Sequence, residues 1–233
     1  MLDIIKLVIF YNKVKKDFVK SNPFLYNRLN ELDKTSVDRQ ELIIEICKGK
    51  KVLHFGFLDS PLLEERLNDN ALLHQIIRQH ARFLYGADID EDSLQKYREI
   101  TGDYNNLIVN AQNFLECPEL INDFELVLFP EVLEHVLNPG IVLTNLKELC
   151  ALNSNAKLCI TVPNAFSIQG FVAAMNNFEY VHPDHYYYFS PVTLKKLLTD
   201  CGFNKIDIKL YGYGYMVDAP ALTKNGVVAI CES

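Results

Sequence analysis

The segment from Phe124 to His135, FELVLFPEVLEH, constrains the fold more than any other stretch. Its first six residues are an apolar run, typical of a strand buried on both faces of a parallel sheet. Pro130 is predicted to end the strand's ladder pairing, and the residues from Glu131 to His135 are predicted to open a helix. Ligands of open α/β sheets bind beyond the carboxyl ends of the strands, so this turn marks a candidate site. An acidic first turn that only complements the helix dipole remains the alternative.

Strands and helices alternate along most of the chain with short connections. The predicted strands lie at 51–55, 83–87, 106–109, 124–129, 157–162, 205–211 and 226–231. The predicted helices lie at 71–82, 91–100, 140–151 and 192–201, with a further helix capped by Ser60 and begun at Pro61. This alternation predicts an α/β fold with a parallel, doubly wound sheet and helices on both faces.

The first 46 residues predict a helical extension, followed by one domain over 47–233. The apolar stretch from Leu2 to Tyr11 is interrupted by Asp3 and Lys6 and is too short to span a bilayer. We expect an amphipathic helix that packs on its own domain or joins two subunits in a homodimer. Contact with a membrane surface is the less favoured alternative.

Charge and cysteine content exclude several classes of protein. The 233 residues carry a net charge of −7, which argues against general nucleic-acid binding, because that binding needs clustered basic side chains. The six cysteines are scattered without a CxxC pair, which favours a reducing, cytoplasmic location over a disulfide framework or a zinc site. No other segment resembles a targeting signal.

Four blocks, VLHFGFLDS, YGADID, FELVLFPEVLEH and KLCITVPN, occur in an order and at distances that resemble the class I S-adenosylmethionine-dependent methyltransferases. The resemblance covers roughly residues 50 to 231. It implies a Rossmann-like, seven-stranded, mostly parallel sheet whose last hairpin is antiparallel, with S-adenosylmethionine as the cofactor. It also implies that Asp88 holds the ribose hydroxyls. The cofactor-binding residues implied in this way are Gly56, Asp59, Ser60, Asp88, Ile89, Asn110, Ala111 and Pro130.

The glycine-rich loop departs from the pattern of this family. His54 stands where an acidic residue is usual, and Leu58 and Ser60 replace the later glycines, so only Gly56 remains. Asp59 and Ser60 are expected to meet the amino or carboxylate group of the cofactor, unless they merely cap a helix. A non-catalytic, cofactor-binding partner subunit therefore stays open. The alternative of a nicotinamide-binding Rossmann domain is rejected, because the sequence lacks the G-x-G-x-x-G motif of such domains.

The block HPDHYYYFSPVTLKKLL resembles the substrate-facing lid of bacterial sugar and polysaccharide O-methyltransferases. The expected acceptor is thus the hydroxyl of a sugar or nucleotide-sugar in polysaccharide biosynthesis. A histidine is the expected general base, either His185 or His135. The residues expected to contact the acceptor are Glu131, His182, Tyr186 and Tyr187.

The spacing Glu131-x-x-Glu134-His135 also resembles the metal-binding motif of small-RNA 2′-O-methyltransferases and of ubiquinone-pathway O-methyltransferases. On one helical face, Glu131 and Glu134 would join His135 and a downstream histidine around a divalent ion. This alternative, in which the acceptor is a quinol precursor or RNA, is less favoured than a site without metal, because such clusters often pair internally.

Overall fold

The structure is a computed structural model that describes residues 37–114, 117–212 and 221–233. The predicted helices within the first 36 residues, including the stretch from Leu2 to Tyr11, lie outside the described residues. Most of the tyrosine-rich connection after Tyr211 lies outside them as well.

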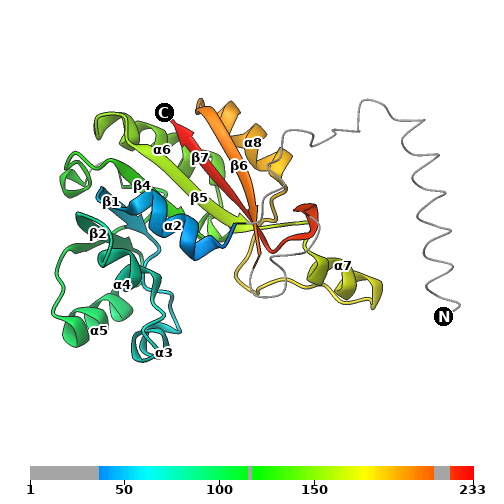
Figure 1. The fold of residues 1–233 in the computed structure, drawn as a ribbon, viewed down its shortest axis with the longest axis horizontal. Coiled ribbons are helices and arrows are strands. Elements are labelled where there is room, and N and C mark those ends of the chain that lie inside the picture. The colour runs from blue at the N-terminus through cyan, green and yellow to red at the C-terminus, as the bar shows by residue number, and fades with distance from the viewer. Residues whose placement is uncertain (1–36, 115–116, 213–220) are drawn as a thin grey trace, which may run out of the picture. The chain divides into compact units, whose positions relative to one another are not determined.

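A seven-stranded sheet forms the centre of the fold, with the strand order β3-β2-β1-β4-β5-β7-β6 (Figure 1). The strands are β1 (Lys51–Phe55), β2 (Phe83–Asp88), β3 (Asn106–Ile108), β4 (Leu126–Pro130), β5 (Lys157–Pro163), β6 (Asn204–Tyr211) and β7 (Gly226–Glu232). The first five strands pair in parallel, and β7 runs antiparallel to both β5 and β6. The predicted Rossmann-like sheet with an antiparallel last hairpin is thus confirmed.

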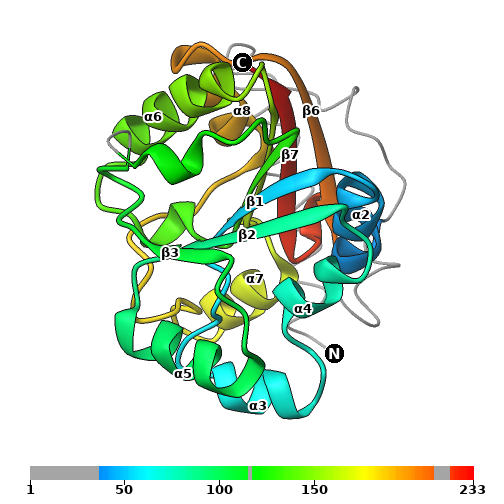
Figure 2. The same ribbon diagram turned by 90° about the vertical axis from the view of Figure 1, so that its left-hand side faces the viewer.

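Helices cover both faces of the sheet, as Figure 2 shows for α2 and α4 on one side and α6 and α8 on the other. The helices are α2 (Arg39–Cys47), α3 (Leu63–Asn68), α4 (Leu73–Arg78), α5 (Glu91–Thr101), α6 (Pro139–Leu152), α7 (Ile168–Met175) and α8 (Pro191–Asp200). Ile43 and Cys47 of α2 pack with Ile77 of α4 onto Val52 and Leu84 of the sheet. The described end of the predicted extension, α2, therefore packs onto the sheet.

The strands match the sequence-based predictions to within about two residues, but the helices near the first loop differ. The predicted start of a helix at Ser60 and Pro61 is wrong, because α3 begins at Leu63. The Ser60 hydroxyl donates instead to Asp90, 2.6 Å away, and so does not cap a helix. The predicted helix over 71–82 is only six residues long, and α7 was not predicted at all.

The turn after β4 also differs from the prediction. Pro130 does not end the ladder but pairs with Thr161 as the last residue of the strand. Glu131 then adopts a left-handed backbone conformation with φ 53°, and residues 133–135 form one 3₁₀ turn. Glu131 and Glu134 therefore do not share one face of an α-helix, because the first α-helix after β4 starts only at Pro139.

All six cysteines are free thiols. Among the helices that the structure describes, none has the length and apolar character needed to cross a bilayer.

Candidate active site

The carboxyl end of β2 presents Asp88, the predicted ribose-binding residue. Its Oδ1 accepts the N–H groups of Ile89 (2.8 Å) and Asp90 (3.2 Å), and its Oδ2 accepts the N–H of Leu58 (3.0 Å). Burial raises the pKa of this carboxyl, and the three N–H donors oppose that rise. A carboxylate has about four lone-pair sites, so one position on Oδ2 stays open to a hydroxyl donor.

Two further predicted cofactor residues lie beside Asp88 because β2 pairs in parallel with β3. Asp88 is in register with Ile108, and its carbonyl accepts the N–H of Val109 at 2.7 Å, so Asn110 follows directly. Asn110 and its neighbour Ala111 form a turn in which the Asn110 Oδ1 accepts the N–H of Gln112 at 2.8 Å. The side chain of Ile89 is 64% exposed, an unusual position for an apolar group unless a ligand covers it. A carboxylate, an exposed apolar side chain and an amide at one sheet edge fit the ribose and adenine of S-adenosylmethionine.

Only glycine fits at position 56, because the turn after β4 approaches the backbone there, a contact that the sequence did not show. Its φ is 65°, and a Cβ atom there would lie 2.3 Å from Cγ2 of Val132. The close approach is thus made by the turn after β4, which ties the first loop to the candidate catalytic residues. The next two side chains, Phe57 and Leu58, are buried, and the Phe57 ring would clash with a side chain at Gly86. Apolar packing therefore shapes this loop where the family uses glycines.

Asp59 and Ser60 already have protein partners. The Asp59 carboxylate accepts from Nε of Arg66 at 2.8 Å, and both groups are about half exposed. The Ser60 hydroxyl lies 2.6 Å from Asp90 and 3.0 Å from the hydroxyl of Ser93. Contact of either residue with the cofactor stays a prediction.

Glu131 is anchored from two other strands at the carboxyl edge of the sheet. Its Oε1 accepts from the hydroxyl groups of Thr161 on β5 and Tyr211 on β6, both at 2.7 Å. Its N–H donates to the carbonyl of Thr161 at 2.8 Å, and Nε of Arg39 lies 4.0 Å from Oε1. These contacts hold the left-handed conformation of Glu131, which costs free energy for a non-glycine residue. Sequence reasoning missed Arg39, Thr161 and Tyr211, and no local motif marks them.

Glu134 is a carboxyl group without hydrogen-bond partners in the interior. It is 0% exposed, and among the described residues neither carboxyl oxygen has a hydrogen-bond partner. Burial, followed by the nearby carboxylate of Glu131, raises the pKa of Glu134 to about 9. Such a group is costly in a folded protein, which makes Glu134 a candidate for a functional role.

Three histidines gather around Glu134. The rings of His135 and His185 are 4.5 Å apart between centroids and nearly perpendicular, at 88°. The His182 ring is 5.2 Å from His185 and 6.0 Å from His135. Burial lowers the pKa of both His135 and His185, and the neighbouring histidines lower it further. Ligand atoms of Glu134, His135 and His185 all lie within 4.8 Å of one another, so this group has the donors of a metal site, whereas Glu131 is not part of it.

The aromatic segment 178–189 is attached to the turn after β4 by main-chain contacts. The N–H of Tyr186 donates to the carbonyl of Glu134, and the Tyr187 hydroxyl donates to the carbonyl of Leu137, both at 2.9 Å. The Tyr186 side chain remains 64% exposed and the Tyr187 side chain 38% exposed. Both tyrosines are therefore held next to the histidine cluster with ring surface available to a ligand.

Comparison with solved structures places this fold among S-adenosylmethionine-dependent methyltransferases. One from Thermotoga maritima, described as a possible histamine N-methyltransferase, has a TM-score of 0.58 at 13% identity, covering 85% of this chain and 89% of that chain. One from Mesorhizobium loti has a TM-score of 0.54 at 11% identity, covering 82% and 96%. One from Archaeoglobus fulgidus has a TM-score of 0.51 at 18% identity, covering 93% and 99%. Identities this low show the fold alone.

Residues 68–208, more than half of the chain, match the family model described as a methyltransferase domain. The chain therefore belongs to this methyltransferase domain family, and its cofactor is S-adenosylmethionine. Among curated proteins, none matches the sequence.

Replacing Asp88 with alanine should weaken S-adenosylmethionine binding at least tenfold. The substitution removes a charge-assisted acceptor, and such hydrogen bonds contribute about 1.5–3 kcal/mol. Isothermal titration of the folded variant measures the change. Asp92→Ala, an exposed acidic residue in the first turn of α5, is the matched control and should bind like the wild type. Unchanged affinity in Asp88→Ala would remove Asp88 from the cofactor site.

Proposed function

We propose that the enzyme transfers a methyl group to the hydroxyl of a small, sugar-like acceptor such as a sugar or nucleotide-sugar in polysaccharide biosynthesis. One observation carries the proposal. A pair of perpendicular imidazoles, His135 and His185, lies beside a buried carboxyl at the carboxyl end of β4. That edge is where open α/β sheets bind their ligands.

S-adenosylmethionine supplies a methyl group made electrophilic by the positively charged sulfur. The acceptor oxygen forms a bond to the methyl carbon while the carbon–sulfur bond breaks, and the electron pair of that bond stays on sulfur. The hydroxyl proton passes to a ring nitrogen of His185 or His135. A positioned base is needed because a neutral hydroxyl is a weak nucleophile, and such a base contributes about 10²–10⁴-fold.

The surroundings of the cluster favour a sugar-like acceptor. Tyr186 and Tyr187 offer exposed ring faces, against which the C–H groups of a pyranose pack well. Glu131, held in place by Thr161 and Tyr211, offers a carboxylate that accepts hydrogen bonds from neighbouring hydroxyls. His182, with a side chain 57% exposed, adds another polar group at the mouth of the site.

A divalent cation held by Glu134, His135 and His185 is the second candidate mechanism. The observation that favours it is the buried carboxyl of Glu134. Neither of its oxygens has a hydrogen-bond partner among the described residues, and one of them lies within 4.8 Å of a ring nitrogen on each histidine. The mixed nitrogen and oxygen donor set suits several first-row divalent metals better than Ca²⁺. Such an ion would lower the pKa of a bound hydroxyl and replace the histidine base.

The test is a screen for methyl transfer from labelled S-adenosylmethionine to nucleotide-sugars, quinol precursors and RNA, each run with a chelator, without it, and after adding back Mg²⁺ or Mn²⁺. We expect label only in the nucleotide-sugars, and equally with the chelator present. Label in RNA or quinol precursors would overturn the sugar assignment. Activity that vanishes with the chelator and returns with metal would overturn the histidine base in favour of the cation, and Glu134→Gln should then lose calorimetric Mn²⁺ binding.

A further inference from the structure

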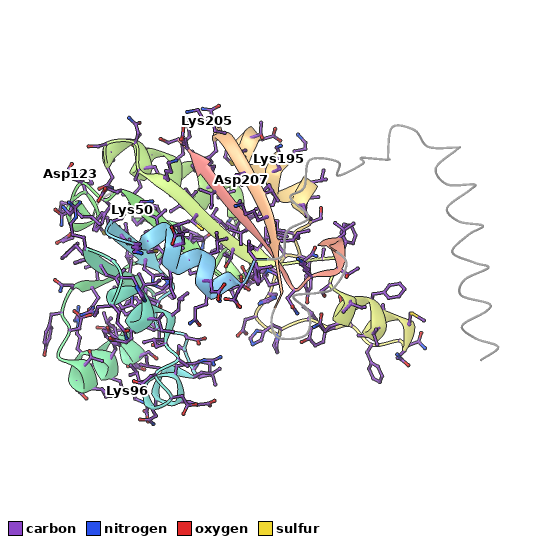
Figure 3. All side chains as sticks on the ribbon, in the orientation of Figure 1. Lys50, Lys96, Asp123, Lys195, Lys205 and Asp207 are labelled. Carbon is purple, nitrogen blue, oxygen red and sulfur yellow. The ribbon has the colours of Figure 1, made fainter. Side chains whose placement is uncertain are left out.

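Helix α7 is unusual because none of its residues is buried. Figures 1 and 3 show it projecting from the rest of the described domain, with side chains extending into open space. Most residues of α7 are nevertheless apolar, and the large ones recur at a spacing that places them on one face of the helix. These four residues, named here the α7 stripe, are Ile168, Phe171, Val172 and Met175, which are 37% to 57% exposed.

Exposed aromatic residues also precede and follow the helix in the sequence. The residues concerned are Phe166, Phe178 and Tyr180, which are 54%, 71% and 63% exposed. With Phe171 at 57%, and taking about 200 Å² per aromatic side chain, these rings leave roughly 500 Å² of surface uncovered. Together with the aliphatic members of the stripe, this approaches the roughly 800 Å² that each partner contributes to a stable interface. Monomeric proteins rarely expose an apolar patch of this size without a function.

The charges around the stripe indicate what covers it. Residues 165–189 contain no lysine or arginine and only two acidic residues, Glu179 and Asp184. Helices that lie on membranes usually carry basic residues on their polar face, so an anionic lipid surface is a poor match. A second copy of the chain is a good match, because two proteins of net charge −7 repel least where their surfaces are uncharged.

We propose that the α7 stripe is a homodimer interface, in which α7 of one copy packs against α7 of the other around a two-fold axis. Phe171 and Val172 stand at the middle of the stripe and therefore lie close to that axis, where a residue meets its own copy. The interface also fixes the start of the segment that carries His182 and His185, so the dimer would hold the acceptor side of the site in place.

The first test is the molar mass of the full-length protein by sedimentation equilibrium. The wild type should be a dimer at micromolar concentration, and Phe171→Ser should weaken the dimer about 30-fold or more, the usual loss for a central aromatic residue. Ile141→Ser on α6, an equally apolar residue with 53% exposure, is the matched control and should leave the dimer unchanged. A monomeric wild type, or a dimer that survives Phe171→Ser in a folded variant, would overturn the proposal.

Charge exchange at the axis provides the second test. Val172→Lys and Val172→Asp should each be monomeric, because like charges meet at the axis, whereas an equimolar mixture should form a heterodimer. A mixture that stays monomeric would contradict the two-fold contact.

In a third test, the wild type is mixed with phosphatidylcholine vesicles. If a monomeric wild type sediments with the vesicles and Phe171→Ser does not, the α7 stripe binds lipid and the proposed dimer is rejected.

Discussion

Turnover of the His185→Ala variant should fall by roughly 10²–10⁴-fold while its affinity for S-adenosylmethionine stays unchanged. The loss follows from removing the imidazole that takes the hydroxyl proton, and a general base contributes about this factor. Cofactor affinity should be kept because Asp88, Ile89 and Asn110 lie on β2, β3 and their loops, away from the histidine cluster. Initial rates with the acceptor found in the screen, and calorimetry with the cofactor, measure the two quantities.

His135→Ala, assayed in the same way, decides which imidazole is the base. The base variant should lose turnover and recover part of it when free imidazole is added to the buffer. His80→Ala is the matched control, since His80 is exposed and its backbone makes hydrogen bonds that the substitution keeps: its N–H donates to Ile77 and its carbonyl accepts from Gly49. Normal turnover in both His185→Ala and His135→Ala would show that histidine base catalysis is wrong and that alignment of the acceptor suffices.

The second large effect concerns stability in acid and arises from a buried histidine pair that is not part of the catalytic cluster. Nδ1 of His54 on β1 lies 3.1 Å from Nδ1 of His74 on α4, and both residues are at most 1% exposed. Burial lowers the pKa of His54 to about 3, and burial next to His54 and Arg78 holds the pKa of His74 well below its ordinary value. The His74 ring packs against the rings of Phe57 and Tyr97, so protonation of the pair would disrupt the core beneath the first loop.

The sign of the pH dependence follows from these directions. The unfolded chain binds protons at both histidines below about pH 6.5, and the folded chain does not. The contribution to stability is therefore fully present above pH 6.5 and is lost as pH falls toward 3. Between pH 7.5 and pH 5, His54 alone should lower the free energy of unfolding by about 2 kcal/mol.

Glu134 acts in the opposite direction over the same range, because its raised pKa favours the folded state as pH falls. The measurement must therefore compare two proteins rather than two pH values. We expect urea unfolding of the double variant His54→Leu/His74→Leu to lose less stability between pH 7.5 and pH 5 than the wild type, by about 2 kcal/mol or more. His80→Ala should follow the wild type. Equal pH dependence in the double variant and the wild type would show that the pair is protonated or open to water in the folded protein.

Much of the fold was predictable because it depends on local sequence patterns. Apolar runs separated by amphipathic segments predict buried strands and crossover helices, and β1 was located at Lys51–Phe55 as the structure has it. The position of Asp88 followed from the same pattern, because a polar residue directly after a buried strand lies at the carboxyl edge of a parallel sheet. The family resemblance supplied the antiparallel hairpin, which strand patterns alone do not distinguish.

Tertiary structure alone decided how the turn after β4 is built. Sequence patterns favoured a helix from Glu131, since acidic residues suit a first helical turn. In the fold, hydroxyl groups of Thr161 and Tyr211 hold the Glu131 carboxylate from 30 and 80 residues away, and the backbone at Glu131 turns left-handed. No local pattern encodes such contacts, because they arise only when the sheet brings Thr161 of β5 and Tyr211 of β6 to the residue that follows β4.

The candidate catalytic cluster shows the same division. The sequence predicted His135 and His185 as candidate bases and His182 as a contact of the acceptor, and its family resemblance implied cofactor residues after the first strands. Only the tertiary structure brought His185 against His135 and buried the Glu134 carboxyl where no other described residue forms a hydrogen bond with it. The physical reason is that burial and ring contacts depend on how separate segments meet in space, whereas hydrophobic periodicity reports only the face on which each segment is buried.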